Sequence, residues 1–240
     1  MRTFLRSLMK IVAFLLAAAV LITLVVCVVF GVKGYGMYQK AVEQEPIQQK
    51  IETIYAQEHF TKFSDLPEIY VDAVISVEDH RFWQHGGMDI VAIGRALWSD
   101  IKSFSLAEGG STITQQLAKN LYFTREKQLE RKFAEVCAAF ALESQYSKQE
   151  IFELYVNTIY FGSGYYGIYE AAQGYFGKEP WELDDYESVM LAGLPNAPSA
   201  YSPDKDPSLA EQRMEHVLKR MVACGTLTQQ EANAILLETP

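Results

Sequence analysis

The sequence predicts a mainly α-helical protein that begins with one membrane-spanning helix. Residues 11–32 form an uninterrupted apolar run. Helix-capping boxes recur in the remainder, at Ser147, Asp184 and Thr228, each followed three residues later by a glutamate. Strand-like alternation of apolar and polar residues is scarce, and no βαβ pattern is present. These observations favour a helical body attached to a membrane anchor.

The apolar run, IVAFLLAAAVLITLVVCVVFGV, holds 22 residues without a charge. At about 1.5 Å per residue it would form a helix of roughly 33 Å, enough for a hydrocarbon layer of about 30 Å. A cleavable signal peptide would have a shorter apolar region and a small-x-small cleavage pattern, which does not follow here. Arg2, Arg6 and Lys10 outnumber the bases just beyond the run. We therefore expect a single-pass cell-membrane protein with residues 1–10 in the cytoplasm and the body outside.

Charge is distributed unevenly along the chain. Residues 1–40 carry five bases and no acid, which leaves 16 bases and all 30 acids, a net charge of −14, for residues 41–240. So acidic a body excludes a nucleic-acid partner held by bulk charge, and an anionic ligand would need a local basic cluster. The spacing of Cys27, Cys137 and Cys224 indicates free, buried thiols, because it fits neither a disulfide framework nor a C-x-x-C site.

A polar segment over residues 33–60 follows the anchor. Ile47, Ile51 and Ile54 recur there at helical spacing, so we expect a partly helical stalk. The body then occupies residues 61–240. Its helices are expected to begin at Pro67, Thr112, Ser147, Asp184 and Thr228, with a long helix within residues 125–146.

An adjacent acidic pair, Glu78 and Asp79, ends the apolar part of AVISVEDHRFWQHGG over residues 73–87. Carboxylates are unfavourable near a helix C-terminus, and local rules tend to be broken where function requires it. Glu78 could be a general base or a solvated helix end. A metal site would add His80 and His85, but these are five residues apart, unlike the i, i+4 pair of H-E-x-x-H.

One dense basic run interrupts the acidic body. It consists of Lys119, Arg125, Lys127, Arg131 and Lys132. A phosphate or pyrophosphate group is the ligand that such a basic cluster favours. Glu126 and Glu130 lie between the bases at helical spacing, which is typical of a solvated charged face. Both interpretations remain open from the residues alone.

Glu135 is a second candidate carboxylate. It flanks the apolar face of the expected long helix, where a buried carboxylate needs a partner. Arg131 at i−4 and Lys132 at i−3 are within reach. An intrahelical ion pair and a functional site explain this pattern equally well.

The segment from Gly162 to Gly167 formally fits the G-x-G-x-x-G dinucleotide motif. That motif must follow a strand of a parallel sheet. Here a capped helix precedes it, and no further strands are predicted. We therefore interpret it as a glycine- and tyrosine-rich turn.

The order of the segments is more specific than any one of them. EDHRFWQHGG (78–87), GGSTITQQLAKN (109–120), RKFAEVCAAFALE (131–143) and KQEIFELYVN (148–157) precede YFGSGYYGIYEAAQGYFGK and LAGLPNAPSAYSP. Together they resemble the peptidoglycan glycosyltransferases of family 51, the polymerase module of bifunctional penicillin-binding proteins, from about Leu66 to Met221. Because no room remains for a transpeptidase domain, the chain resembles the monofunctional transglycosylases. The resemblance implies a mainly α, lysozyme-like head with a smaller membrane-proximal jaw lobe, preceded by one transmembrane helix.

The resemblance also implies an activity. The family polymerises lipid II, a disaccharide-pentapeptide on undecaprenyl pyrophosphate, into glycan strands with inversion. By resemblance, Glu78 is the general base for the acceptor 4-hydroxyl and Glu135 assists at the donor pyrophosphate. The residues expected to bind substrate are Asp79, Ser111, Thr112, Gln115, Gln116, Lys119, Arg125, Lys127 and Arg131. No cofactor is required by this chemistry, although a divalent cation (Mg or Mn) is compatible with the pyrophosphate, and no protein metal site is expected.

The expected partners are lipid II, the growing glycan chain, membrane lipid and a cell-wall synthesis complex. Residues 88–106, with Trp98, Phe104 and Leu106, could enter the membrane interface or pack within the jaw. The chain departs from the family where Lys127 replaces a usual arginine and where Arg213 stands alone instead of in an arginine pair. We expect a structural role for Arg213. A glycan hydrolase using Glu78 as an acid and a non-enzymatic scaffold are the rival hypotheses.

Overall fold

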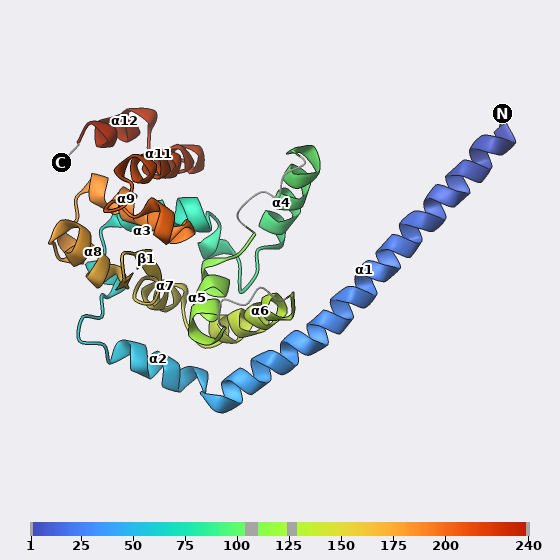
Figure 1. The fold of residues 1–240 in the computed structure, drawn as a ribbon, viewed down its shortest axis with the longest axis horizontal. Helices are drawn as coiled ribbons and strands as arrows, with labels where there is room; N and C mark the ends of the chain where they lie inside the picture. Colours follow the sequence, from blue (N-terminus) through green and yellow to red (C-terminus); the bar gives the residue numbers. More distant parts are fainter. Residues whose placement is uncertain (1, 104–109, 124–128, 239–240) are drawn as a thin grey trace.

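The N-terminal helix is the longest element. The computed structural model describes residues 2–103, 110–123 and 129–238. Helix α1 (Arg2–Gln44) is continuous and projects away from the body (Figure 1). It is long and apolar enough to cross a membrane, and its apolar stretch is not buried against protein. This unbroken helix is therefore consistent with the predicted membrane anchor.

The body is built almost entirely of helices. They are α2 (Ile47–Tyr55), α3 (Glu68–Glu78), α4 (Ile90–Ser103), α5 (Ile113–Tyr122), α6 (Leu129–Glu143), α7 (Lys148–Val156), α8 (Ile168–Phe176), α9 (Asp185–Gly193), α10 (Pro198–Tyr201), α11 (Pro207–Cys224) and α12 (Gln229–Leu237). Short 3-10 turns are η1 (Phe63–Asp65), η2 (Phe82–Gln84), η3 (Pro180–Glu182) and η4 (Leu194–Asn196). The mainly α class predicted from the sequence is confirmed.

The helix starts were predicted from local capping chemistry, and the structure confirms them. Thr112 accepts a hydrogen bond from the Gln115 backbone N–H. Ser147, Asp184 and Thr228 each form a complete capping box with the glutamate three residues on. These side chains satisfy backbone N–H groups that the first helical turn leaves without an intrahelical partner.

The glycine-rich segment forms a small hairpin. Strands β1 (Tyr160–Gly162) and β2 (Tyr165–Tyr166) pair antiparallel. Gly162 and Gly167 have φ values of 98° and 85°, which favour glycine because it lacks a Cβ. Since the described part of the chain contains no parallel sheet, the rejection of a dinucleotide-binding fold is confirmed.

Two groups of helices enclose the core. Helices α3, α9 and α11 pack on one another, while α5 packs against α6 and α7 (Figure 1). Tyr70, Phe82, Phe152 and Tyr155 are fully buried in the cluster that joins these groups. This packing fixes the C-terminal end of α3 and the N-terminal end of α5, which position the site.

The expected stalk, residues 33–60, is part of this packing. The C-terminal part of α1 lies against α6. Gly34 allows this close approach, because a Cβ at this position would lie 2.7 Å from the Glu130 carbonyl oxygen. Ile47, Ile51 and Ile54 are buried in the core. The sequence therefore predicted the helical spacing, whereas the structure shows that these apolar side chains join the body.

The three cysteines are free, as expected. Cys27 lies on the apolar stretch of α1, where a membrane position was expected, whereas Cys137 and Cys224 are half-buried and not buried. The helix faces that carry them are only partly covered by neighbouring elements.

Candidate active site

Glu78 is the last residue of α3 and faces a cleft. Its side chain is 10% exposed. Oε2 accepts a hydrogen bond from Gln116 Nε2 at 2.7 Å, and Oε1 lies 3.7 Å from Arg213 Nη2. The carboxylate is thus held between side chains of α5 and α11, which contradicts the alternative of a solvated, frayed helix end.

The cleft beside Glu78 has a volume of about 600 Å³. This is within the usual size range of small-molecule sites. Its walls come from α3, α4, α5, α11, η4 and the segment before α5. The predicted site residues that line it are Glu78, Asp79, Ser111, Thr112, Gln116 and Lys119. The structure therefore brings together residues from two of the sequence segments that indicated the family.

Cations gather around the cleft in spite of the acidic body. Lys119, Arg95, Arg213 and Arg220 all line it. The pKa of His80 is lowered by burial and by the charges of Arg95 and Arg220, which outweigh the opposing effect of nearby carboxylates. The local field in this part of the cleft consequently favours an anionic ligand.

The contribution of α11 was not predicted. Arg213, His216 and Arg220 line the cleft from this helix. Arg213 Nε donates to the Gly193 carbonyl at 3.0 Å, and its guanidinium lies over the Tyr201 ring. The structural role expected for Arg213 is present, but the contact with Glu78 adds a role at the site. The spacing i, i+3, i+7 places the three residues on one helix face. This spacing is the sequence signal that could have predicted their place at the site.

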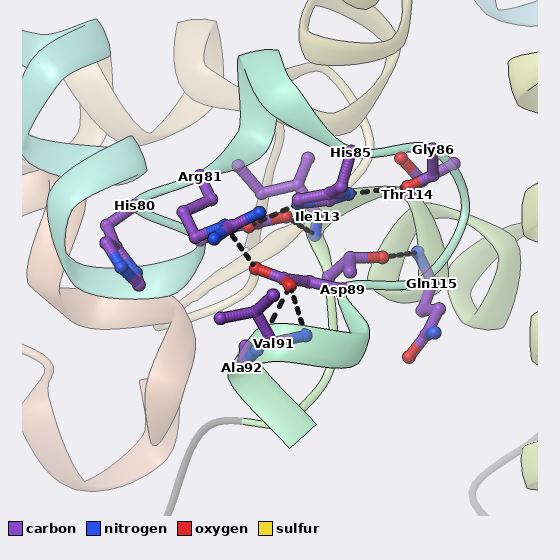
Figure 2. A network of polar contacts seen from close by, with 12 residues as sticks. His80, Arg81, His85, Gly86, Asp89, Val91, Ala92, Ile113, Thr114 and Gln115 are labelled. Atoms are coloured by element: carbon purple, nitrogen blue, oxygen red, sulfur yellow. Dashed lines mark hydrogen bonds and ion pairs between the residues drawn. The ribbon is translucent and has the colours of Figure 1, made fainter. Parts of the chain in front are cut away.

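Asp79 contacts His85 and Ile113, two residues labelled in the polar network of Figure 2. Its Oδ1 lies 2.7 Å from His85 Nε2, and its Oδ2 accepts from the Ile113 backbone N–H at 3.1 Å. Both oxygens of this predicted substrate-binding residue are therefore engaged within the protein. By binding an otherwise unsatisfied N–H at the start of α5, Asp79 positions the helix that presents Gln116 to Glu78.

The contacts of His85 in this network favour its charged form. Burial alone would lower the pKa of His85, but hydrogen bonds to Asp79 and to the Gly86 carbonyl, together with the Asp79 charge, raise it. Nε2 faces a carboxylate and Nδ1 lies 2.6 Å from the Gly86 carbonyl oxygen. Because both partners only accept hydrogen bonds, both ring nitrogens are placed to donate when the ring is protonated.

Asp79, His85 and Asp89 place ligand atoms within 4.8 Å of one another, and each of them is engaged by groups of the protein. The His85 ring lies between the Asp79 carboxylate and the Gly86 carbonyl oxygen. Asp89 Oδ1 caps α4 by accepting from the Val91 and Ala92 N–H groups, and its Oδ2 lies 3.2 Å from Arg81 Nε (Figure 2). These contacts lower the pKa of Asp89 in spite of its burial. The cluster is explained as an ion-pair network.

Thr112 and Gln115 hold the loop before α4. Thr112 Oγ1 and Gln115 Nε2 both donate to the Gly87 carbonyl, at 3.2 and 3.0 Å. Gln115 is buried and does not line the cleft. Of this predicted substrate-binding pair, only Thr112 borders the cleft, and the side chain of Gln115 stabilises the loop because it points toward Gly87.

Glu135 is buried in an ion-pair cluster on α6. Oε1 lies 3.0 Å from Arg131 Nε and Oε2 lies 2.9 Å from Lys132 Nζ. Lys132 Nζ also donates to Ser111 Oγ at 2.6 Å. The expected intrahelical pairs are present, and Lys132 connects them to Ser111 at the cleft wall. Glu135 and Arg131 themselves do not line the described cleft.

Two predicted site residues, Arg125 and Lys127, lie outside the described residues. The same is true of Phe104 and Leu106 in the segment expected at the membrane interface, and of the Trp98 side chain. Ile90 and Val91, at the start of α4, are exposed.

Comparison with known proteins agrees with the sequence motifs. The family model described as Transglycosylase matches residues 44–222. Penicillin-binding protein 1A of Aquifex aeolicus (strain VF5) is 47% identical over 180 residues, which are 75% of this chain and 25% of that protein. Penicillin-binding protein 1A of Neisseria lactamica is 45% identical over 191 residues, 79% of this chain and 24% of that protein.

The chain thus spans about a quarter of the length of these relatives. A crystal structure of penicillin-binding protein 1A from Haemophilus influenzae aligns over 75% of this chain and 17% of that chain, with a TM-score of 0.46 and 26% sequence identity. The family model covers most of the helical body, including Glu78, Glu135 and the cleft. The chain belongs to the transglycosylase family, glycosyltransferase family 51, which its ordered motifs had predicted.

Proposed function

We propose that this chain polymerises lipid II into glycan strands during cell-wall biogenesis. The acceptor 4-hydroxyl would displace undecaprenyl pyrophosphate from the anomeric carbon of the growing chain, with inversion. The observation that supports this most directly is a nearly buried carboxylate, Glu78, beside a cleft that carries several cations. A base next to an anion-binding surface is what this displacement requires.

Glu78 is the proposed general base. Its carboxylate would take the proton from the acceptor hydroxyl as the oxygen attacks, and would then release it to water. The Gln116 hydrogen bond and the Arg213 charge both stabilise the ionised carboxylate, which is the form that accepts a proton. They also restrict its orientation, which a general base within hydrogen-bond reach needs.

A hydrogen bond from Tyr155 orients the side-chain amide of Gln116. Burial and the nearby charge of Glu78 raise the pKa of Tyr155, so its hydroxyl stays protonated. This hydroxyl donates to Gln116 Oε1 at 3.3 Å. The amide oxygen therefore faces Tyr155 and the amide N–H group faces Glu78.

The leaving pyrophosphate departs as the bond from its oxygen to the anomeric carbon breaks. It needs no proton if cations hold its charge. Lys119 at the cleft and the Arg131–Lys132–Glu135 cluster on α6 are the proposed cradle, with Glu135 keeping the two bases in place. A divalent cation, Mg or Mn, bound with the pyrophosphate would supply further charge neutralisation. Because displacement occurs in one step, no covalent protein nucleophile is required.

Helix α1 would place the cleft beside a lipid-linked substrate. The proposed topology has the N-terminus in the cytoplasm, α1 across the cell membrane and the helical body outside, where the acceptor glycan grows. We propose membrane lipid and a cell-wall synthesis complex as further partners. The monofunctional type and the boundaries at residues 10, 32 and 60 stay predictions.

Incubation of the detergent-solubilised protein with labelled lipid II, followed by gel separation of the products, tests the proposal. The wild type should yield a ladder of glycan polymer that Glu78→Gln abolishes. Glu68→Gln is the matched control, because it makes the same change at an exposed position of α3. Unchanged polymerisation by Glu78→Gln would refute the assignment. Shortening of preformed glycan without a ladder would favour a hydrolase, and neither product would favour a scaffold.

A further inference from the structure

A second cavity lies where α1 leaves the apolar run. It has a volume of about 560 Å³ and is lined by residues of α1, α6 and the C-terminal end of α5. Lys33, Lys40 and Arg131 contribute bases to its wall, whereas Glu130 is the acidic residue among the lining residues. Among the described residues, its lining shares no member with that of the Glu78 cleft. It is therefore a cavity distinct from the Glu78 cleft, with an excess of positive charge in its wall.

The position of this cavity along α1 matches the membrane surface. Lys33 is the first charged residue after the apolar run of residues 11–32. Lys40 lies seven residues later on the same helix face, roughly 10 Å further along the axis. The headgroup region adds several Å on each side of the hydrocarbon layer, so the bases of the cavity are at headgroup depth if α1 crosses the membrane.

The ion pairs of the cavity leave positive charge available. Lys33 Nζ lies 3.5 Å from the Glu130 carboxylate, and the Arg131 guanidinium forms an ion pair with Glu135. Lys40 forms no ion pair within the described part of the chain. Met37, Ala41 and Phe123 contribute apolar surface to the wall. A phosphate group joined to an apolar chain matches both parts of this lining.

We propose that this cavity binds the phosphodiester headgroup of an anionic bilayer phospholipid, with the first carbons of its acyl chains against the apolar wall. The inference rests on the proposed placement of α1 in the membrane. Bound lipid would bridge α1 and α6 and so hold the catalytic body at a fixed height above the bilayer. The site adds to the proposed activity, and Arg131 is a residue of its wall that also belongs to the proposed pyrophosphate cradle.

Native mass spectrometry of the full chain, titrated with phosphatidylglycerol or phosphatidylcholine, tests the site. The wild type should retain phosphatidylglycerol in preference to phosphatidylcholine. Lys33→Gln/Lys40→Gln should weaken phosphatidylglycerol binding by about 30-fold, because it removes two lysines that each attract the anionic headgroup. Lys205→Gln/Lys219→Gln removes the same charge from exposed positions on the body and should bind as the wild type does.

A second variant reduces the volume of the cavity and leaves its charge unchanged. A Cβ at Gly36 meets nothing within 4 Å, and Gly36 lines the cavity. Gly36→Leu should therefore fold normally, fill part of the cavity and reduce phosphatidylglycerol binding. Equal binding by the wild type and both cavity variants would overturn the proposal. Displacement of the lipid by inorganic phosphate at the same concentration would also overturn it, because the site would then recognise a free anion.

Vesicle flotation separates this outcome from failure of the membrane placement. The wild type and all variants should float with phosphatidylglycerol vesicles, because α1 is unchanged in its apolar run. A wild-type chain that does not float would refute the placement of α1, and the lipid site with it. Flotation without a lipid preference in mass spectrometry would refute the lipid site alone.

Discussion

Replacement of Gln116 by leucine tests whether this residue positions the base or binds substrate. Leucine has a similar size but cannot donate the 2.7 Å hydrogen bond to Glu78 Oε2. It also leaves the buried Tyr155 hydroxyl without its acceptor at position 116. The family resemblance implied substrate binding for Gln116, whereas the structure directs its amide to the proposed base.

The size of the effect follows from the bond that is lost. A hydrogen bond to a charged group contributes about 1.5–3 kcal/mol. If all of it serves to orient Glu78 in the transition state, kcat should fall between about 10-fold and 150-fold. Loss of the acceptor for Tyr155 should lower the free energy of unfolding by about 1–3 kcal/mol, because a buried hydroxyl is left unsatisfied.

Initial rates of lipid II polymerisation at several substrate concentrations separate the two roles. Positioning predicts a lower kcat with little change in KM, whereas substrate binding predicts a higher KM. Asn120→Leu is the matched control, since Asn120 is exposed on the same helix, α5. A folded Gln116→Leu protein with kcat within twofold of the wild type would refute the positioning role.

Two further predictions concern stability. The raised pKa of His85 means that its pair with Asp79 stabilises the fold fully below the unfolded-state pKa of about 6.5 and loses this effect as pH rises through the higher folded-state pKa. The melting temperature of His85→Gln should therefore lie furthest below that of the wild type near pH 6 and approach it at alkaline pH. Gly34→Leu should cost about 1–3 kcal/mol of unfolding free energy, because its side chain would overlap the α6 backbone.

The glycine prediction has a control within the chain. Gly36→Leu adds the same side chain to α1 one half-turn away, where a Cβ meets nothing within 4 Å. Melting curves in detergent that show a constant His85→Gln deficit across pH, or equal stability of the two glycine variants, would contradict the packing described above.

Local patterns in the sequence were sufficient to predict where helices begin. Thr112, Ser147, Asp184 and Thr228 each bind an N–H group within three residues, so the capping chemistry is complete inside a short window. The partners of Glu135 were predicted for the same reason, since they lie three and four residues away on one helix.

Contacts between distant segments could not be predicted in this way. The isoleucine spacing of residues 47–54 indicated a helix, but whether its apolar face met solvent, another chain or this core depended on the path of the chain after α1. Gln115 and Gln116 are neighbours in sequence, yet one binds the Gly87 carbonyl and the other binds Glu78. Their directions are set by how α5 rotates against α3 and α6, which no local rule determines.

The sequence by itself determined the helical class, the apolar anchor, the capped helix starts and, through the order of its motifs, the family. Only the tertiary structure decided which side chains surround Glu78: Gln116 from α5 and Arg213 from α11 meet at one carboxylate. It also decided that Asp79 fixes α5 through Ile113. Propensity and capping act within about one helical turn, whereas the surroundings of a buried carboxylate depend on how helices from distant parts of the chain pack together.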